Sequence, residues 1–260
     1  MKIIVLRKDT FKKLGLVFLF VLFSIFIANE DTYNVLGVFL QNGKELPIYS
    51  VETQEKKVAF SFDAAWGTEY TEDILKILKE RNIKTTFFLV GFWVDKHPDM
   101  VKKIVEDGHE IGNHSSTHPH MTRLKDEQIR KELEDTSNKI QQLTGKRPIL
   151  FRPPYGDYND RVIKTARELG YYVIQWDVDS LDWKELGIQP IIDRVTSKVK
   201  NGSIILFHNN AKYTAKALPV LIDELQQKGY KIVPVSELIY KDNYYVDHEG
   251  RQRPLETNNN

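Results

Sequence analysis

The sequence predicts an α/β fold in which a parallel sheet of about seven strands is covered by helices and curls into an incomplete (β/α) barrel. The first observation is an alternation: from Val58 to Val235, short apolar segments typical of buried strands alternate with longer amphipathic segments typical of helices. The second is that several helical segments end at a glycine, which adopts the left-handed conformation of a helix C-terminus without a steric penalty. The number of strands favours an incomplete barrel over an open doubly wound sheet.

The elements can be assigned in order along the chain. The strand-like segments are residues 58–62, 85–90, 109–114, 149–153, 171–178, 203–208 and 230–235. The amphipathic, helix-like segments are residues 71–82, 98–108, 125–145, 160–170, 190–202 and 218–229. Because helical segments separate the strands, neighbouring strands are expected to run parallel.

The N-terminus differs from the rest of the chain. Residues 1–28 hold a basic flank and an uninterrupted apolar run from Leu14 to Ala28, the pattern of an export signal or a membrane anchor. Phe26 stands where a signal-peptidase site needs a small residue. We therefore expect an uncleaved membrane anchor with the folded domain outside the cytoplasm. If the signal is cleaved, the protein is secreted.

The rest of the chain divides into three parts. Residues 29–55 are predicted to form a connector with a small hairpin at Asn42-Gly43. Residues 56–240 hold the alternating strands and helices. Residues 241–260 form a polar tail that we expect to be disordered.

Composition excludes some classes of function. The chain has 37 basic and 36 acidic side chains and a net charge of +1, so it lacks the overall positive charge of nucleic-acid-binding proteins. It has no cysteine, which excludes disulfides, thiolate metal sites and cysteine nucleophiles. Any metal must therefore be bound by histidine and carboxylate.

Ionisable side chains gather at the ends of the predicted strands. In parallel α/β folds the residues that carry chemistry lie at the carboxyl ends of strands, where the loops meet. The candidates at these positions are Asp63, His114, His118, Arg152, Asp177, Asp179, Asp182 and His208. Their types are those that metal-assisted hydrolysis uses.

Two pairs among these candidates suggest direct interactions. His114 and His118 lie four residues apart in HSSTH, so both imidazoles can reach one ion if the segment forms a helical turn; otherwise they are surface histidines. Arg152 follows an apolar strand and precedes two prolines. A buried charge there needs a partner, for which Asp63 is the natural candidate, and the alternative is a surface arginine at a turn.

The last two strand ends offer a possible acid or base. The segment DVDSLDW (177–183) contains three acids, of which only one needs a chemical role, the orientation of a neighbouring base. His208 ends the apolar segment SIILFH, where a general acid or base would lie. A histidine at a strand end can also be purely structural, so this assignment depends on its neighbours.

Five motifs in this order resemble those of the polysaccharide deacetylases, the NodB-homology carbohydrate esterases: FSFDAAWG, HSSTH, FRPPYG, DSLDW and IILFH. The resemblance covers about residues 56 to 240. The FDAAWG variant and the N-terminal anchor look most like the sporulation-associated PdaB-like branch of that family.

The resemblance implies a distorted, incomplete (β/α) barrel in which a divalent metal, often zinc, activates water to remove acetyl groups from N-acetylated sugars. Asp63 matches the catalytic base and Arg152 the residue that orients it. His208, tuned by Asp182, matches the general acid.

The resemblance also implies how the substrate is held. The backbone N–H of Tyr155 would stabilise the oxyanion, and Trp183 and Leu206 would line the acetyl pocket. These three positions match the motifs FRPPYG, DSLDW and IILFH.

The metal site departs from the family pattern. His114 and His118 match the metal-binding histidines, but Ala64 stands where the family has a metal-binding aspartate directly after the base. Two neutral histidines offer less charge compensation than an Asp-His-His set. We therefore expect weak binding of a divalent ion, with zinc as the expected metal.

Three functions fit these observations. The first is a membrane-tethered, metal-dependent deacetylase of N-acetylated cell-wall glycan. The second is a catalytically weak or inactive glycan-binding or structural wall protein on the same fold. The third is a glycosidase that pairs Asp63 with Asp177, Asp179 or Asp182 as its two carboxylates, although it leaves the histidines unexplained.

The expected partners are cell-wall polysaccharide and the membrane, not nucleic acid; the sequence does not determine the oligomeric state.

Overall fold

The computed structural model describes residues 44–255. The predicted anchor in residues 1–28 and the predicted turn at Asn42-Gly43 lie outside the described residues. Within residues 44–255, no helix is both long enough and apolar enough to cross a membrane.

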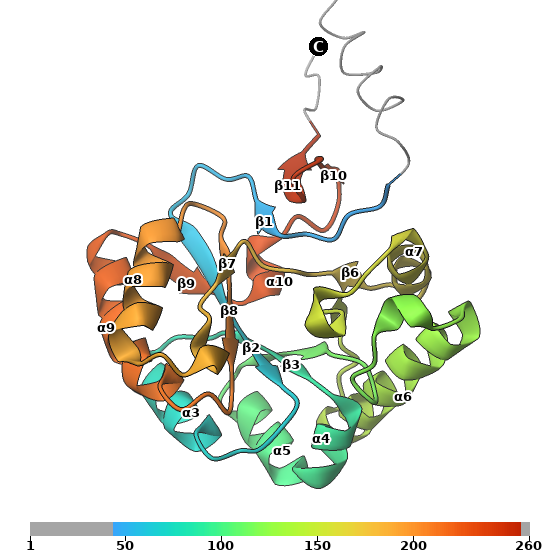
Figure 1. Cartoon of the computed structure of the whole chain (residues 1–260), viewed down its shortest axis with the longest axis horizontal. Coiled ribbons are helices and arrows are strands. Elements are labelled where there is room, and N and C mark those ends of the chain that lie inside the picture. Colours follow the sequence, from blue (N-terminus) through green and yellow to red (C-terminus); the bar gives the residue numbers. More distant parts are fainter. Residues whose placement is uncertain (1–43, 256–260) are drawn as a thin grey trace, which may run out of the picture. The chain divides into compact units, whose positions relative to one another are not determined.

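The main sheet of the described residues has eight strands, and all their pairings are parallel. Its order is β6-β5-β4-β3-β2-β8-β7, with β9 paired to the start of β2. Helices surround it (Figure 1), which confirms the predicted parallel α/β fold. The strands are β2 (Lys57–Ala64), β3 (Thr86–Leu89), β4 (Glu110–Asn113), β5 (Leu150–Phe151), β6 (Tyr172–Val173), β7 (Val178–Asp179), β8 (Ile204–His208) and β9 (Lys231–Val233).

The sheet is curled, as predicted for an incomplete barrel. The segment 171–178, predicted as one strand, forms β6 and β7, which lie at opposite edges of the sheet. A flat sheet of seven strands would place its edges about 29 Å apart at ~4.8 Å per step. The five residue steps from Val173 to Val178 span at most about 18 Å. The two edges must therefore approach each other.

The six predicted helices are confirmed. They are α3 (Thr71–Glu80), α5 (Pro98–Glu106), α6 (Asp126–Thr144), α7 (Asp160–Glu168), α8 (Ile188–Lys198) and α9 (Thr214–Gln227). Two short helices, α4 (Gly91–Lys96) and α10 (Val235–Leu238), were not predicted because so few residues show no clear period. Helix α9 begins before the predicted Leu218, so Pro219 lies inside it rather than at its start.

The alternation of side chains along β2 positions the candidate site. Phe60, Phe62 and Ala64 belong to the core between the sheet and the helices, where Phe62 stacks on Phe87 at 4.9 Å between ring centroids. Successive residues of a strand face opposite sides. Asp63 therefore faces the interior of the curled sheet, near the carboxyl end of β2.

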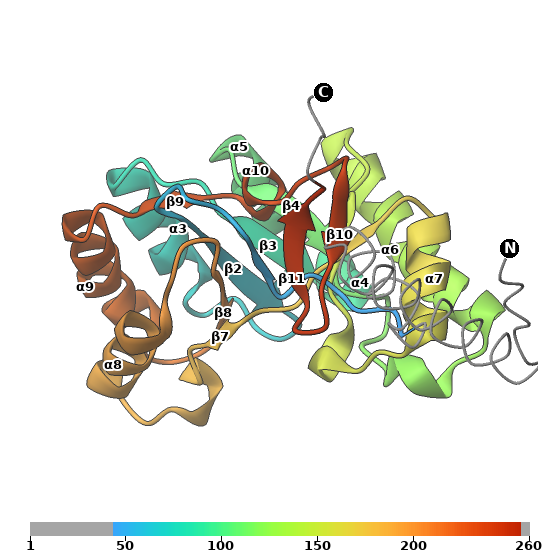
Figure 2. The ribbon, with the colours of Figure 1, turned by 90° about the horizontal axis from the view of Figure 1, so that it is seen from above.

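The polar tail is ordered over most of its length, so the prediction of disorder was wrong for these residues. β10 (Tyr244–Val246) pairs antiparallel with β11 (Arg251–Pro254), which pairs in parallel with β1 (Ser50–Val51). Figure 2 shows this hairpin from above, close to β1. Part of the predicted connector, residues 50–51, thus belongs to the same sheet as the tail.

Polar side chains hold this hairpin together in addition to Val246, which packs against the apolar cluster that includes Val51. The Asp247 carboxylate accepts hydrogen bonds from the N–H groups of Glu249 and Arg251 and from Arg253 Nε. Gln252 is fully buried and exchanges two hydrogen bonds with the backbone of Tyr240. A composition typical of disorder is overridden because the buried side chains of Asp247 and Gln252 find hydrogen-bond partners.

Candidate active site

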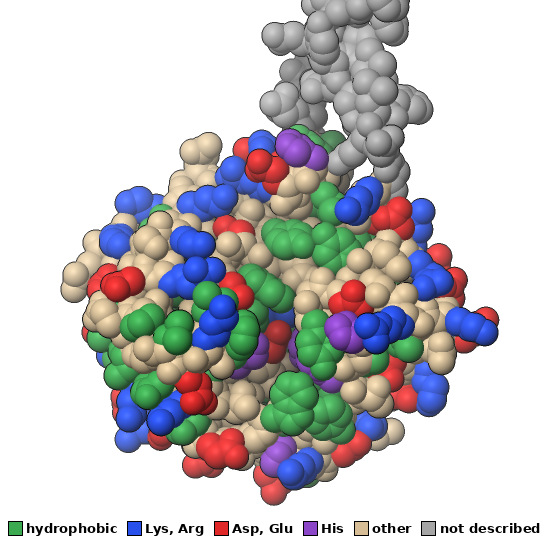
Figure 3. Space-filling model, viewed as in Figure 1, with side chains coloured by type: hydrophobic (Ala, Val, Ile, Leu, Met, Phe, Trp, Pro, Cys, Tyr) green, Lys and Arg blue, Asp and Glu red, His purple; other side chains and the backbone are tan. Residues whose placement is uncertain are grey.

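The candidate residues converge at the carboxyl ends of the central strands, as predicted. Asp63 is near the end of β2 and His208 is the last residue of β8, while His114 and Arg152 directly follow β4 and β5. Asp63 and His208 are register partners on neighbouring strands. Their side chains therefore leave the same face about 4.8 Å apart at the backbone. Figure 3 shows histidine and acidic side chains in a hollow rimmed by hydrophobic ones.

Asp63 and Arg152 form a buried ion pair. Arg152 is fully buried, and its Nη1 donates to Asp63 Oδ1 at 2.7 Å. Its Nη2 donates to Ser61 Oγ and to the Gln175 carbonyl, and its guanidinium lies 4.1 Å from the Phe88 ring centroid. Burial alone would raise the pKa of Asp63, but the charge of Arg152 holds it below its usual value. The sequence-based pairing is thus confirmed, and Asp63 is ionised.

His114 places a second acceptor beside Asp63. Its Nδ1 donates to the carbonyl of Arg152 at 2.7 Å, so in the neutral ring Nε2 carries a lone pair. Burial lowers the pKa of His114 despite the charge of Asp63. Its Nε2 lies 3.4 Å from Asp63 Oδ2. Two acceptors face each other at this distance, an arrangement that a cation or a water molecule between them would stabilise.

His118 lies next to His114 without the helical turn that the spacing suggested. Ser115 and His118 both have positive φ, 68° and 56°, so the segment is a loop. The His114 and His118 rings nevertheless lie 5.0 Å apart. Burial and the neighbouring His114 lower the pKa of His118 to about 4, so its ring is neutral at pH 7. Its Nδ1 is buried and has no hydrogen-bond partner within residues 44–255.

Glu132 on α6 holds the loop that carries His118. Its Oε2 accepts from the N–H groups of Ser116 and Thr117 at 2.8 Å each, and its Oε1 accepts from the Thr117 hydroxyl. Sequence reasoning missed this residue because nothing in a charged helical segment distinguishes one glutamate from the next. Its contact is made only in the folded chain.

His208 is held by one of the three candidate acids, Asp182. Asp182 is fully buried; its Oδ1 lies 2.8 Å from His208 Nδ1, and its Oδ2 accepts from the His208 N–H. The Thr214 hydroxyl donates to the same Oδ2 at 2.6 Å. Burial alone would lower the pKa of His208, but the hydrogen bond and charge of Asp182 raise it. Thr214 was missed because it lies far from Asp182 in sequence.

The other two acids have structural contacts. Asp177 accepts from Ser203 Oγ and from the Ile204 N–H at the start of β8, and Asp179 accepts from the Leu181 N–H. Ile204 is four residues, or about 13 Å, along β8 from the position opposite Asp63. Asp177 therefore does not face Asp63 as a glycosidase carboxylate would. This arrangement argues against Asp177 as the second carboxylate of a glycosidase, and the Asp182 oxygens are already engaged by His208 and Thr214.

The three predicted substrate residues differ in exposure. Leu206 is buried on β8, two positions before His208 and on the same face. Tyr155 is 60% exposed, has φ 59°, and packs edge-on against His118. Trp183 is 54% exposed and follows Asp182 directly. All three lie beside site residues, and their roles stay predictions.

The donors for a metal ion are incomplete. Ala64 is fully buried in the apolar core together with Leu89 and Val90. In the part of the chain that the structure describes, no group of three or more His, Cys, Asp or Glu side chains is arranged to hold a metal ion. The two neutral imidazoles and the unpartnered Nδ1 of His118 fit part of a metal site, but catalytic zinc usually has three protein ligands.

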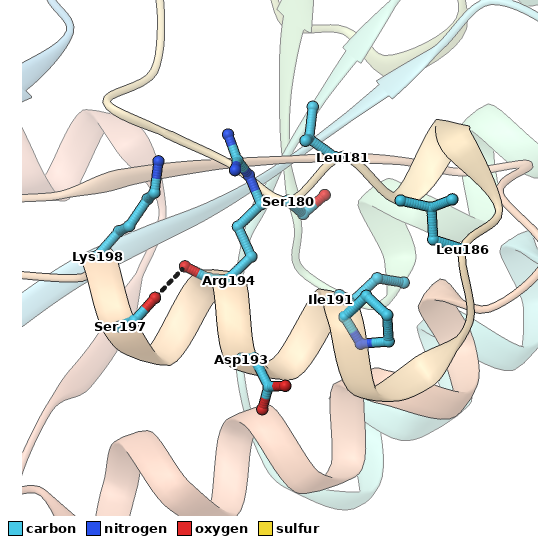
Figure 4. Close-up of a pocket in the computed structure, with 9 residues that line it drawn as sticks. Ser180, Leu181, Leu186, Ile191, Asp193, Arg194, Ser197 and Lys198 are labelled. Atoms are coloured by element: carbon cyan, nitrogen blue, oxygen red, sulfur yellow. Dashed lines mark hydrogen bonds between the residues drawn. The ribbon is translucent and has the colours of Figure 1, made fainter.

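A separate cavity of about 360 Å³ lies beside this site, between α8 and the segment that follows β7 (Figure 4). Arg194 lines one side of this cavity, and its Nε donates a hydrogen bond to the Asp179 carbonyl. The strand-end candidates are not among the residues that line it, which are Ser180, Leu181, Leu186, Pro190, Ile191, Asp193, Arg194, Ser197 and Lys198. The candidate active site is the open hollow of Figure 3 instead.

Comparison with known proteins agrees with this geometry. Residues 50–174 match the family model described as polysaccharide deacetylase. The peptidoglycan-N-acetylglucosamine deacetylase of Bacillus cereus is 37% identical over 196 residues, which cover 74% of this chain and 92% of that protein. The chain belongs to the polysaccharide deacetylase family. The uncharacterized protein YlxY of Bacillus subtilis is 40% identical over 203 residues, but the match spans only 63% of its length and 78% of this chain.

One similar solved structure is described as a pseudoenzyme rather than as an active deacetylase. BA3943 of Bacillus anthracis, described as a CE4 family pseudoenzyme, is 38% identical with a TM-score of 0.72, and the match covers 74% of this chain and 68% of that one. A mutant of BA3943 described as having restored enzymatic activity is 40% identical, with the same TM-score and coverage of 74% and 70%. These similarities confirm the fold and family that the motifs predicted.

Proposed function

We propose that this chain hydrolyses N-acetyl groups of cell-wall glycan, with peptidoglycan N-acetylglucosamine as the expected sugar. The observation that carries the proposal is the register pairing of Asp63 with His208 across β2 and β8. It places an ionised carboxylate next to an imidazole whose pKa is raised. A base and an acid side by side suit a hydrolysis that needs both. The activity of the Bacillus cereus relative supports the choice of substrate.

Each residue has a defined task in this proposal. Asp63, kept ionised by Arg152, removes a proton from the attacking water as the water oxygen forms a bond to the acetyl carbonyl carbon. Protonated His208, stabilised by Asp182, gives its proton to the sugar nitrogen as the C–N bond breaks, and acetate and a free amine result. The Tyr155 N–H stabilises the oxyanion.

The acetyl group and the ion need further residues. Leu206 and Trp183 would enclose the acetyl methyl group, since both are apolar and lie beside His208 and Asp182. A divalent ion, such as zinc, would be held by His114 and His118 and would supply polarisation of the amide carbonyl. Without an aspartate at residue 64, we expect the ion to bind weakly.

The protein's location is also part of the proposal. The basic flank and apolar run in residues 1–28 support a membrane anchor that leaves the catalytic domain outside the cytoplasm. The FDAAWG variant and this anchor support the PdaB-like branch and a role in sporulation. Recovering the mature chain in the soluble fraction, with its N-terminus near residue 29, would contradict the anchor and leave export intact.

A second candidate is a glycan-binding protein with little or no catalysis. The observation that favours it is Ala64, which leaves two histidines as the metal donors of the hollow. The similarity to a protein described as a pseudoenzyme points the same way. The buried Asp63–Arg152 pair and the His208–Asp182 pair favour catalysis instead, because binding alone does not need a base beside an acid.

Acetate release separates the two candidates. The full chain is incubated with N-acetylated peptidoglycan strands, with added Zn²⁺ and with a chelator, and acetate is measured. We expect acetate with the ion, little with the chelator, and none from Asp63→Asn. An Asp177→Asn variant serves as control, since Asp177 contacts Ser203 and the start of β8. Strands that bind but release no acetate would establish the second candidate.

A further inference from the structure

Exposed aromatic side chains form a pair at one edge of the hollow. Trp66 is 55% exposed and Phe92 is 37% exposed, and their ring centroids lie 6.4 Å apart. Trp66 also packs edge-on against His118 at 5.0 Å. Large apolar groups are normally withdrawn from water, and an exposed cluster beside a site indicates a binding surface. This Trp66–Phe92 pair has no role in the hydrolysis described above.

The segment that carries Trp66 is held rigidly. The carbonyl of Gly67 accepts hydrogen bonds from Trp93 Nε1 at 2.8 Å and from Asn209 Nδ2 at 2.9 Å. Trp93 and Asn209 are both buried, and Asn209 also donates to Thr71 Oγ1. Gly67 has φ +58°, which a residue with a Cβ rarely adopts. Trp66 is therefore fixed in its exposed position, at little further cost in entropy when a ligand binds.

Phe92 is fixed by the loop that carries His118. The N–H groups of Gly91 and Phe92 donate to the carbonyls of Ser115 and Ser116. A Cβ at Gly91 would lie 2.9 Å from Ser116 Cα, so α4 can approach the loop this closely only with glycine there. Phe92, Trp66 and His118 therefore keep their mutual positions as one unit.

Contacting rings continue past His118. Tyr155 packs against His118 at 4.5 Å, and His120 stacks on Tyr155 at 4.6 Å. Ring contacts thus run without a break from Phe92 through Trp66 and His118 to Tyr155 and His120. A row of rings longer than one sugar suits a chain of sugars better than a single one.

We propose that the Trp66–Phe92 pair binds a second sugar of an N-acetylated glycan chain, next to the sugar whose acetyl group lies at Asp63 and His208. The C–H face of a pyranose ring is apolar and packs on aromatic rings, while its hydroxyls stay in water. The inference rests on the proposed function for the class of sugar. It assigns the Trp66–Phe92 pair a part in holding the glycan chain beside the reacting sugar.

Calorimetry with two ligands tests this inference. Free N-acetylglucosamine and its β-1,4-linked tetramer are titrated into the full chain with chelator present, and acetate is assayed after each titration. We expect Trp66→Ala to weaken tetramer binding about tenfold and to leave monomer binding unchanged. Phe92→Ala should weaken it less, and Trp66→Phe should restore most of the affinity. Tyr245→Ala, which removes an exposed ring on β10, is the control and should change neither.

The outcomes separate this inference from the proposed function. Equal tetramer affinity in wild type and Trp66→Ala, an equal loss in Tyr245→Ala, or no tetramer binding by the wild type would each overturn the Trp66–Phe92 subsite, even if acetate is released when Zn²⁺ is added. Tetramer binding that depends on Trp66, without acetate release under any condition, would support the subsite and overturn the deacetylase proposal.

Discussion

The two halves of the candidate site differ in whether their charged and ligating groups have the partners that their chemistry needs, although Arg152 Nε, like His118 Nδ1, is buried without a hydrogen-bond partner in residues 44–255. In the proton-transfer half, the charges of Asp63 and Arg152 meet, and His208 is matched by Asp182. In the metal half, His118 has a buried Nδ1 without a partner in residues 44–255, and Ala64 supplies no ligand.

The two halves differ because losing a residue from each one changes the stability of the fold by a different amount. A buried charge without its partner destabilises a protein strongly, so the loss of either Asp63 or Arg152 alone lowers the stability of the fold. Ala64 is apolar and fully packed in the core, so the loss of a carboxylate there leaves no buried charge behind. Metal binding can therefore weaken in this fold while the structure and the proton-transfer pair are kept.

The largest expected effect comes from breaking the charge pair of the proton-transfer half. Arg152→Leu leaves the Asp63 carboxylate buried without its cation, and we expect a loss of about 3–5 kcal/mol in the free energy of unfolding. Urea unfolding measures it. Arg130→Leu, which removes an exposed bridge to Glu168, should cost about 1 kcal/mol or less. Similar losses in the two variants would contradict the view that burial makes the first pair critical, and adding Asp63→Asn to Arg152→Leu should recover part of the loss.

The next effect comes from completing the deficient half. Ala64 packs in the apolar core but is the last residue of β2, so Ala64→Asp completes the metal site only if the new carboxylate turns at the strand end towards the loop of the two histidines. We expect Zn²⁺ to bind at least about tenfold more tightly, the scale on which ligand-shell groups act. Calorimetry measures it, with thermal unfolding as a check on folding.

The control for this variant is Ala59→Asp, a fully buried alanine five residues, or about 16 Å, before Ala64 on β2. It adds the same charge and should not tighten Zn²⁺ binding. Adding His114→Ala and His118→Ala to Ala64→Asp should remove the gain. If a folded Ala64→Asp protein binds Zn²⁺ no better than wild type, residue 64 does not face the histidine pair.

The third effect concerns pH. The folded pKa of His208 is raised above its unfolded value, so the stabilisation is fully present below about pH 6.5 and is lost as pH rises through the folded pKa. Asp182→Asn should lower the pKa of His208, and this pH dependence should disappear. NMR titration of the imidazole and urea unfolding across that range measure the two quantities. Asp177→Asn should leave the pKa of His208 unchanged. If Asp177→Asn lowers the pKa of His208 as much as Asp182→Asn does, Asp182 is not the cause of the raised pKa.

The smallest effect comes from Thr214. Thr214→Val keeps the shape of the side chain but removes the hydroxyl that donates to Asp182 Oδ2, and we expect a loss of about 1 kcal/mol in unfolding free energy. With one donor fewer, the Asp182 carboxylate should attract the proton of His208 more strongly and raise its pKa slightly. Thr214→Ser keeps the donor and should behave like wild type by NMR and by urea unfolding.

The sequence alone predicted those parts of the site that depend on local pattern. The strand-end positions of Asp63, Arg152 and His208 followed from short apolar runs, and the structure brings these residues together. Local pattern narrowed the partner of His208 only to three acids, because nothing in the sequence of one loop distinguishes neighbouring acids. The family resemblance selected Asp182, and the structure shows its contact with His208.

The sequence by itself determined the alternation of strands and helices and the residues at the strand ends, because both follow from the period of apolar side chains along a short stretch. Only the tertiary structure decided that residues 171–178 form two strands at opposite edges of a curled sheet, that the polar tail pairs with β1, and that Trp66 contacts His118. These features join residues distant along the chain. Their stability comes from hydrogen bonds and packing that exist only once the sheet has closed, so no local pattern carries them.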